Sequence, residues 1–307
     1  MDIAREWTMS KYQKLLLPAL LALGGCSQIE LLDPKGDIGI QEKNLILMAM
    51  GLMLLVVIPV IALTLVFAWR YRSGNKNAAY APNWAHSTRI EIVVWTIPCL
   101  IVGFLGLLIW QSTHVLDPYR PLASKVEPVR VEVVALDWKW LFIYPDQGIA
   151  TVNQLAIPVG TPIAFRLTSA SLMNSFFIPQ LGSQIYAMAG MQTQLHLIAN
   201  EPGTYPGRSA AFSGPGFADM HFDTVAMPRD RFDAWVEQTR SVPMVLDGAA
   251  YAALEQPSLK TPPAVYGGVA PGLFDDIVGR FMDGRMPAFA LNGPICTFDG
   301  QPIRSLD

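Results

Sequence analysis

The stretch LILMAMGLMLLVVIPVIALTLVFAW, residues 45–69, decides the fold together with a second stretch, IVVWTIPCLIVGFLGLLIWQSTHVL, residues 92–116. Neither of these 25-residue stretches contains Asp, Glu, Lys or Arg. Because a helix rises 1.5 Å per residue, about 20 apolar residues are enough to cross the hydrocarbon core of a bilayer. We therefore predict two transmembrane helices, over residues 45–69 and 91–116.

The charges on either side of these helices indicate their orientation. The loop between them, residues 70–90, carries four basic residues and no acidic one, whereas the preceding segment, 26–44, carries four acidic residues. Basic loops stay in the cytoplasm of bacteria. We therefore expect a cytoplasmic loop in a bacterial inner membrane, with the segments before and after the hairpin in the periplasm.

The N-terminus resembles an export signal. A basic stretch from Met9 is followed by the apolar run 15–23 and then by Gly24-Gly25-Cys26. This order is typical of a secretory signal, which we place at residues 1–25 with translation starting at Met9. Leu23-Gly24-Gly25-Cys26 resembles the bacterial lipobox, which implies that Cys26 is lipidated and anchored to membrane lipid. The alternative is an uncleaved signal with an incidental cysteine.

The composition excludes several classes of protein. The chain has 51% hydrophobic and only 15% charged residues, too little charge for a disordered or nucleic-acid-binding protein. Its three cysteines and four histidines lack the spacing of a zinc site or a disulfide framework. We therefore expect no nucleic-acid partner.

The segment that follows the hairpin has the pattern of β-structure. Residues 129–133 and 163–168 alternate apolar and polar side chains, and turns rich in Gly and Pro recur between such runs. We predict a β-sandwich or barrel over residues 125–228. In the last part, residues 229–307, Phe232 and Trp235 lie on one face of a predicted helix, and Leu273 and Phe281 lie on one face of another.

This layout resembles subunit II of the haem-copper respiratory oxidases. The resemblance rests on Glu91–Pro98, Asp137–Trp140 and Ser209–Met220. It implies a two-helix membrane hairpin, then a periplasmic cupredoxin-like β-sandwich and a C-terminal helical arm. In the cytochrome c oxidases the last motif resembles C-x-E-x-C-G-x-x-H-x-x-M and, with an earlier histidine, binds a pair of copper ions.

The copper ligands of that family are largely replaced in this chain. The matching positions are Asn174, Ser209, Ala211, Ser213, Phe217 and Met220. Two serines stand for the bridging cysteines, Asn174 and Phe217 stand for the histidines, and only Met220 matches. A neutral hydroxyl does not bridge copper as a soft thiolate does. We therefore expect a degenerate site and no metal or other cofactor in this chain.

Loss of the copper ligands resembles the quinol-oxidising branch, the cytochrome bo-type ubiquinol oxidases. The similarity runs from Leu31 to about Phe281 and includes Asn174–Pro179 and Gly182–Met191. It implies a subunit of a proton-pumping, H⁺-transporting ubiquinol oxidase that has no catalytic redox centre of its own. The implied partners are subunit I, which holds the haems and copper, the small subunits III and IV, and the ubiquinol pool, but not cytochrome c.

Glu91 is the ionisable residue that we single out at the mouth of a predicted span. Acidic residues at membrane depth tend to mark ion paths, and the matching glutamate of the family resembles the entry of a proton channel in subunit I. The competing interpretation is an ion pair with Arg89 or a carboxylate that snorkels to the membrane surface. Trp138 matches the electron-entry position of the copper-containing branch and is interpreted as packing, and His196 as a surface residue.

Two other functions stay open from the sequence. One is a copper-containing cytochrome c oxidase subunit II, which Ser209, Ser213 and Asn174 oppose. The other is a membrane-anchored lipoprotein without redox function, a scaffold or ligand-binding protein. That function predicts no stable association with a haem protein.

Overall fold

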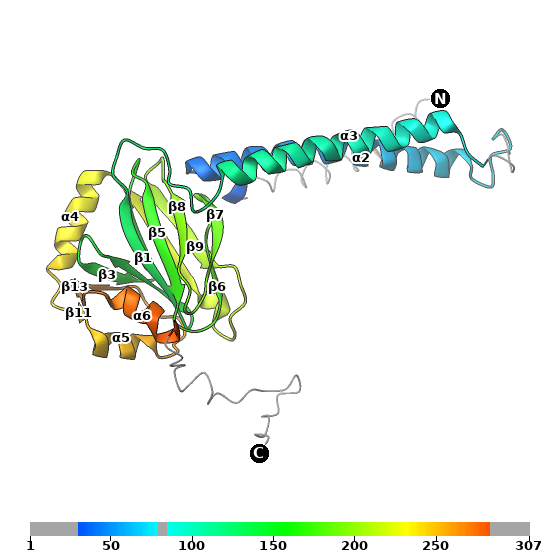
Figure 1. Ribbon diagram of the computed structural model, residues 1–307. Coiled ribbons are helices and arrows are strands. Elements are labelled where there is room, and N and C mark those ends of the chain that lie inside the picture. The colour runs from blue at the N-terminus through cyan, green and yellow to red at the C-terminus, as the bar shows by residue number, and fades with distance from the viewer. Residues whose placement is uncertain (1–29, 79–84, 283–307) are drawn as a thin grey trace, which may run out of the picture.

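A computed structural model describes residues 30–78 and 85–282. The predicted signal, Cys26 and the last 25 residues lie outside the described residues. Figure 1 shows a hairpin of two long helices that projects from a β-sandwich, with shorter helices packed against the sandwich on the side away from the hairpin. The predicted fold class of a membrane hairpin, a sandwich and a C-terminal helical segment is therefore confirmed.

The hairpin consists of α2 (Asp37–Arg70) and α3 (Thr88–Val115). Both helices are long and apolar enough to cross a membrane, and their apolar windows are not buried inside the structure. Helix α2 begins eight residues before the apolar run at Leu45. These extra turns lie against the sandwich rather than in the predicted membrane segment.

The junction between α2 and the sandwich is tight because glycines meet there. The Lys35 N–H donates to the Gln180 carbonyl at 2.6 Å, and the Gly39 N–H donates to the Leu181 carbonyl at 3.1 Å. Gly182 has a φ of +111°, and a Cβ placed on it would lie 2.7 Å from the Gly39 nitrogen. Glycine has no Cβ, so it permits both this backbone conformation and this approach.

Two sheets form the sandwich. The first has the strand order β12-β3-β2-β1-β5-β8, and the second has the order β4-β10-β9-β6-β7. The strands that precede the C-terminal segment are β1 (Val129–Leu136), β2 (Lys139–Tyr144), β3 (Ile149–Val152), β4 (Gln154–Pro158), β5 (Ile163–Ser169), β6 (Asn174–Ile178), β7 (Gly182–Ala187), β8 (Thr193–Leu197), β9 (Gly203–Ser209) and β10 (His221–Met227).

Aromatic side chains fill the space between the sheets. Trp140 and Phe142 from the first sheet meet Phe176 and Phe222 from the second, and all four are at least 99% buried. The rings of Phe176 and Phe222 stack with centroids 5.2 Å apart, and Trp140 meets Phe176 edge-on at 5.4 Å. Such pairs add about 0.5–1.5 kcal/mol to the burial of each ring, so this cluster fixes how the sheets face each other.

The C-terminal segment contains strands as well as helices. Its elements are α4 (Arg229–Arg240), β11 (Val245–Leu246), α5 (Gly248–Glu255), β12 (Ala264–Tyr266), β13 (Gly268–Val269) and α6 (Leu273–Met282). Strand β12 pairs with β3 at the edge of the first sheet. The sequence did not predict these strands. Pro262-Pro263 favours an extended chain just before β12, and the free edge of β3 completes the pairing.

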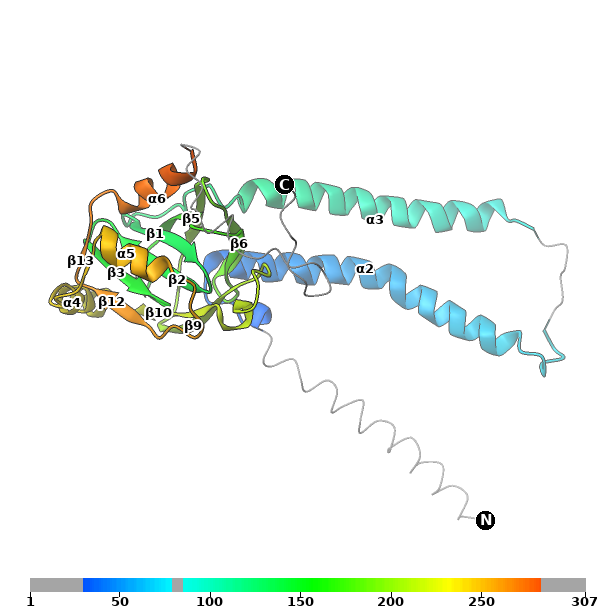
Figure 2. The ribbon, with the colours of Figure 1, turned by 90° about the horizontal axis from the view of Figure 1, so that it is seen from below.

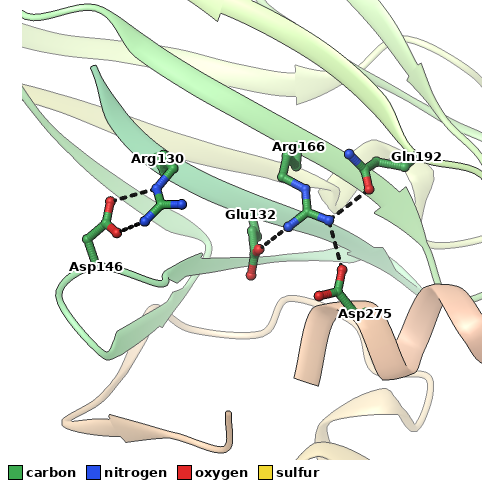
Figure 3. Close-up of polar contacts among 6 residues, drawn as sticks. All are labelled: Arg130, Glu132, Asp146, Arg166, Gln192 and Asp275. Atoms are coloured by element: carbon green, nitrogen blue, oxygen red, sulfur yellow. Dashed lines mark hydrogen bonds and ion pairs between the residues drawn. The ribbon is translucent and has the colours of Figure 1, made fainter. Parts of the chain in front are cut away.

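Arg166 fixes α6 to the outer face of the first sheet, as Figure 3 shows. Its guanidinium donates to Glu132 at 2.8 Å, to Gln192 at 2.8 Å and to Asp275 of α6 at 2.7 Å. It also lies 4.9 Å from the centre of the Phe274 ring. One side chain from β5 therefore ties together two strands of the sheet, a loop and the last described helix.

Candidate functional site

The positions that match copper ligands in the related motif come together at one end of the second sheet. Asn174 begins β6, Ser209 ends β9, and Met220 directly precedes β10. Antiparallel pairing places Phe176 opposite Ser209. Asn174 and Ser209, which are 35 positions apart in the sequence, thus become neighbours.

Hydrogen bonds among the side chains hold this cluster together. The Ser209 hydroxyl lies 3.2 Å from the Asn174 amide oxygen and 3.2 Å from the Ala211 carbonyl, and it donates its proton to this pair of acceptors. The Asn174 amide donates to the Leu172 carbonyl at 3.1 Å. The Ser213 hydroxyl donates to the Met220 sulfur at 3.9 Å. All four polar or sulfur-bearing side chains are buried.

These residues do not fit a pair of copper ions. The donors at the cluster are two neutral hydroxyls, an amide oxygen and a thioether, and the two bridging positions carry no thiolate. The Phe217 ring lies against Phe212, with centroids 5.6 Å apart. His221 follows Met220 at the start of β10 but is exposed, because successive side chains of a strand point to opposite faces. No group of three or more His, Cys, Asp or Glu residues within 30–78 and 85–282 is placed to hold a metal.

Trp138 covers the cluster. It adopts a φ of +63°, and its indole N–H donates to the Ser213 carbonyl at 2.9 Å. A Cβ on Gly216 would lie 2.3 Å from the Trp138 ring, and the Leu259 side chain comes close to the same glycine. Trp138 therefore has a packing role in this structure.

Lys139 fastens the C-terminal segment over this site, a role that the sequence did not indicate. Its side chain is almost fully buried, and its ammonium donates to the Gln256 carbonyl at 2.7 Å and to the Ser258 hydroxyl. Burial lowers the pKa of Lys139. At the other end of this segment, the Asn153 amide donates to the Thr261 carbonyl at 2.8 Å. Residues 256–261 are thus held at both ends.

Glu91 lies in the first turn of α3, at the end of the hairpin that is far from the sandwich (Figure 1). Its side chain is exposed, and its backbone N–H donates to the Ser87 carbonyl at 2.9 Å. Its carboxylate forms no ion pair with Arg89 or with any other residue that the structure describes.

His196 differs from its predicted surface position. It is half-buried on β8, and its Nδ1 lies 3.0 Å from the Pro118 carbonyl. This contact joins β8 to the segment that leaves α3. The strand at His196 agrees with the alternation in the sequence. No local pattern in the sequence predicts that residues 116–120 pack against β8.

A cupredoxin-like sandwich that follows two helices long and apolar enough to cross a membrane defines a subunit II of the haem-copper oxidase class. Residues 146–227 match the family model "Cytochrome C oxidase subunit II, periplasmic domain", and residues 240–285 match "COX Aromatic Rich Motif". The solved periplasmic domain of subunit II of cytochrome oxidase from Bradyrhizobium japonicum has 22% identity to this chain. Its TM-score is 0.36, and the match covers 38% of this chain and 96% of that domain.

Full-length relatives are more similar. Cytochrome bo(3) ubiquinol oxidase subunit 2 of Pseudomonas putida is 57% identical over 88% of this chain and 87% of the relative. Ubiquinol oxidase subunit 2 of Acetobacter aceti is 55% identical over 88% of each chain. The chain belongs to the family of ubiquinol oxidase subunit 2, the subunit II of quinol-oxidising haem-copper oxidases.

Proposed function

We propose that this chain is the subunit II of a proton-pumping oxidase that oxidises two ubiquinols with one O₂ to form two waters, and that it carries no electrons itself. The observation that carries this proposal is the buried hydrogen bond from Ser209 to Asn174, at positions where copper-containing relatives place thiolate and imidazole. Without those ligands the sandwich has no relay for electrons from cytochrome c. Electrons from a membrane-soluble quinol need no such relay.

The redox groups and the quinol site belong to a partner in this proposal. Haem ligation by paired imidazoles needs two histidines at membrane depth, whereas α2 has none and α3 has only His114, at its outer end. Subunit I would hold the haems and copper, and subunits III and IV would complete the complex. This chain would add a lipid anchor at Cys26 and a periplasmic cap.

Glu91 would serve as the proton entry on the cytoplasmic side. Its support is its place in the first turn of α3, after the basic loop, together with a carboxylate that pairs with no described residue. An unpaired carboxylate at a membrane surface can take up a proton from water and pass it to a partner. Trp95, one turn deeper on the same face of α3, is 71% exposed and is available to pack against that partner.

Oxygen uptake by the intact complex, purified through a tag on this chain, tests the proposal. Ubiquinol and reduced cytochrome c are supplied in parallel to the same preparation. Uptake with ubiquinol alone is expected. Uptake with cytochrome c would mean that the sandwich does carry electrons, and a preparation without haem or uptake would favour the scaffold function.

A further inference from the structure

A cleft of about 480 Å³ lies between α2 and α3 near their outer ends. It falls within the range of about 300–1,000 Å³ that is typical of small-molecule sites. Figure 2 shows the two helices running side by side but apart along the hairpin. One face of each helix lines the cleft, because the lining residues recur at intervals of three and four.

The lining changes character with depth. Gln41 and Asn44 of α2 face Gln111 of α3 at the level where the hairpin meets the sandwich. Ser112 lies next to Gln111, and Val115 and Leu116 add apolar side chains at the outer rim. One to two turns deeper, the lining is apolar and includes Met48, Phe104 and Leu108. Because the helices are antiparallel, amides from both helices lie above apolar surface from both.

The three amides are exposed, and none of them hydrogen bonds to another residue in the described ranges. Polar side chains near the hydrocarbon core are costly unless they find a partner. A ligand that fits the cleft therefore carries hydrogen-bonding oxygens on an apolar tail. The lining contains no Asp, Glu, His, Lys or Arg, so nothing in it would take up the protons that a quinol releases or attract a charged headgroup strongly.

We propose that this cleft binds a phospholipid of the outer leaflet, with the ester oxygens at the three amides and one acyl chain along the apolar wall. A glycerophospholipid fits because its ester carbonyls are uncharged acceptors that lie directly above its chains. The occupant is a free bilayer lipid rather than the lipid expected on Cys26. The lipid would hold the outer halves of α2 and α3 at a fixed separation.

The intact complex in nanodiscs of phosphatidylethanolamine and phosphatidylglycerol provides the test. The bilayer contains a small fraction of phosphatidylcholine that carries a diazirine near the ester end of one acyl chain. After illumination, labelled peptides are mapped by mass spectrometry. We expect labelling within residues 41–48 and 104–116.

Matched variants identify the site. Leu108→Trp fills the cleft and is expected to reduce this labelling at least fivefold, and Gln111→Leu is expected to reduce it without adding bulk. Ile109→Trp also introduces a tryptophan, at the adjacent residue, which does not line the cleft. This control variant is expected to leave labelling intact. Haem content and ubiquinol turnover verify that each variant complex is assembled.

The following results would overturn the proposal. Equal labelling of the Leu108→Trp and Ile109→Trp complexes would show that the lipid contact is unspecific. Absence of labelling, with cross-links to a partner helix instead, would show that protein fills the cleft. If a Cys26→Ala variant gave labelling where the parent gave none, the occupant would be the covalent lipid. If a photoreactive quinone competed with the lipid probe for this labelling, the occupant would be the quinol.

Discussion

At the scale of single residues, the positions that resemble a copper-ligand motif carry a buried cluster of hydroxyl, amide and thioether side chains. The sequence predicts which residue stands at each position, because the motif spacing from Ser209 to Met220 is intact. It does not predict the bond between Ser209 and Asn174, since this bond depends on the pairing of β6 with β9. The polar residues have become a structural cluster that stabilises one end of the sheet.

Ser209→Ala is expected to destabilise the sandwich by about 1–2 kcal/mol, because the buried Asn174 oxygen and Ala211 carbonyl lose a donor. Urea unfolding of the full chain in detergent, followed by tryptophan fluorescence, measures this change. Ubiquinol turnover of the assembled complex should stay at the parental rate. A large loss of turnover with normal stability would contradict a purely structural role for Ser209.

Gly216→Ala is expected to cost about 1–3 kcal/mol, because the added methyl group would overlap the Trp138 ring that packs on this glycine. The matched control is Gly248→Ala in the first turn of α5. A Cβ at that position meets nothing within 4 Å, so this change should be neutral or slightly stabilising. The same unfolding experiment compares the two variants, and equal effects would contradict the packing of Trp138 on Gly216.

Glu91→Ala is expected to slow ubiquinol oxidation several-fold while haem content and assembly stay normal, because the carboxylate that accepts the proton is removed. Glu91→Asp should recover part of the rate, whereas Arg89→Gln should have little effect, since these two residues form no ion pair. Oxygen uptake measured against pH follows the loss. Normal turnover in the alanine variant would exclude the proton-entry role.

At the scale of elements, the two hairpin helices and strands β1 and β5 lie where the sequence predicts them, but the C-terminal segment contains strands that it does not predict. Its two predicted helical faces are found in α4 and α6. Strand β12 is missed because three residues carry no period, and its partner β3 lies more than 100 residues earlier. Lys139 is missed for a similar reason, since the partners of its ammonium, Gln256 and Ser258, lie more than 100 residues later in the sequence.

Arg166→Met is expected to loosen α6 and to destabilise the chain by about 2 kcal/mol near neutral pH, because Glu132 is left buried without its partner. Asp275→Asn removes only the negative charge of an exposed carboxylate on α6 and keeps an acceptor oxygen, so it should cost much less. Urea unfolding of both variants measures the difference. Similar costs for the two would contradict the central role of Glu132.

The cost of Arg166→Met should depend on pH. Burial raises the pKa of Glu132 above its ordinary value of 4.5, and Arg166 opposes this rise. Without Arg166 the pKa of Glu132 rises further. A carboxyl whose pKa is raised by folding favours the folded state increasingly as the pH falls through that raised value. The variant therefore regains part of its lost stability as the pH falls from neutral toward the ordinary pKa of 4.5, and a cost that grows on acidification would contradict this sign.

At the scale of the whole molecule, a membrane hairpin, a sandwich and a C-terminal segment act as one body. The glycine junction ties α2 to the sandwich, His196 ties the end of α3 to β8, and Arg166 ties α6 to the first sheet. Composition and charge predict the hairpin and its orientation, but these ties depend on close approaches that no local pattern encodes. These contacts join the hairpin and the C-terminal segment to the sandwich.

The most direct test of a sandwich without copper is the ratio of copper to haem iron in the intact complex. Elemental analysis measures this ratio for the parent and for a Met220→Leu, His221→Gln double variant. Met220 is the thioether of the buried cluster, and His221 is the imidazole that follows it in the sequence. If the sandwich holds no copper, the ratio and the rate with ubiquinol are the same in both preparations. A lower copper ratio in the double variant would contradict a copper-free subunit II.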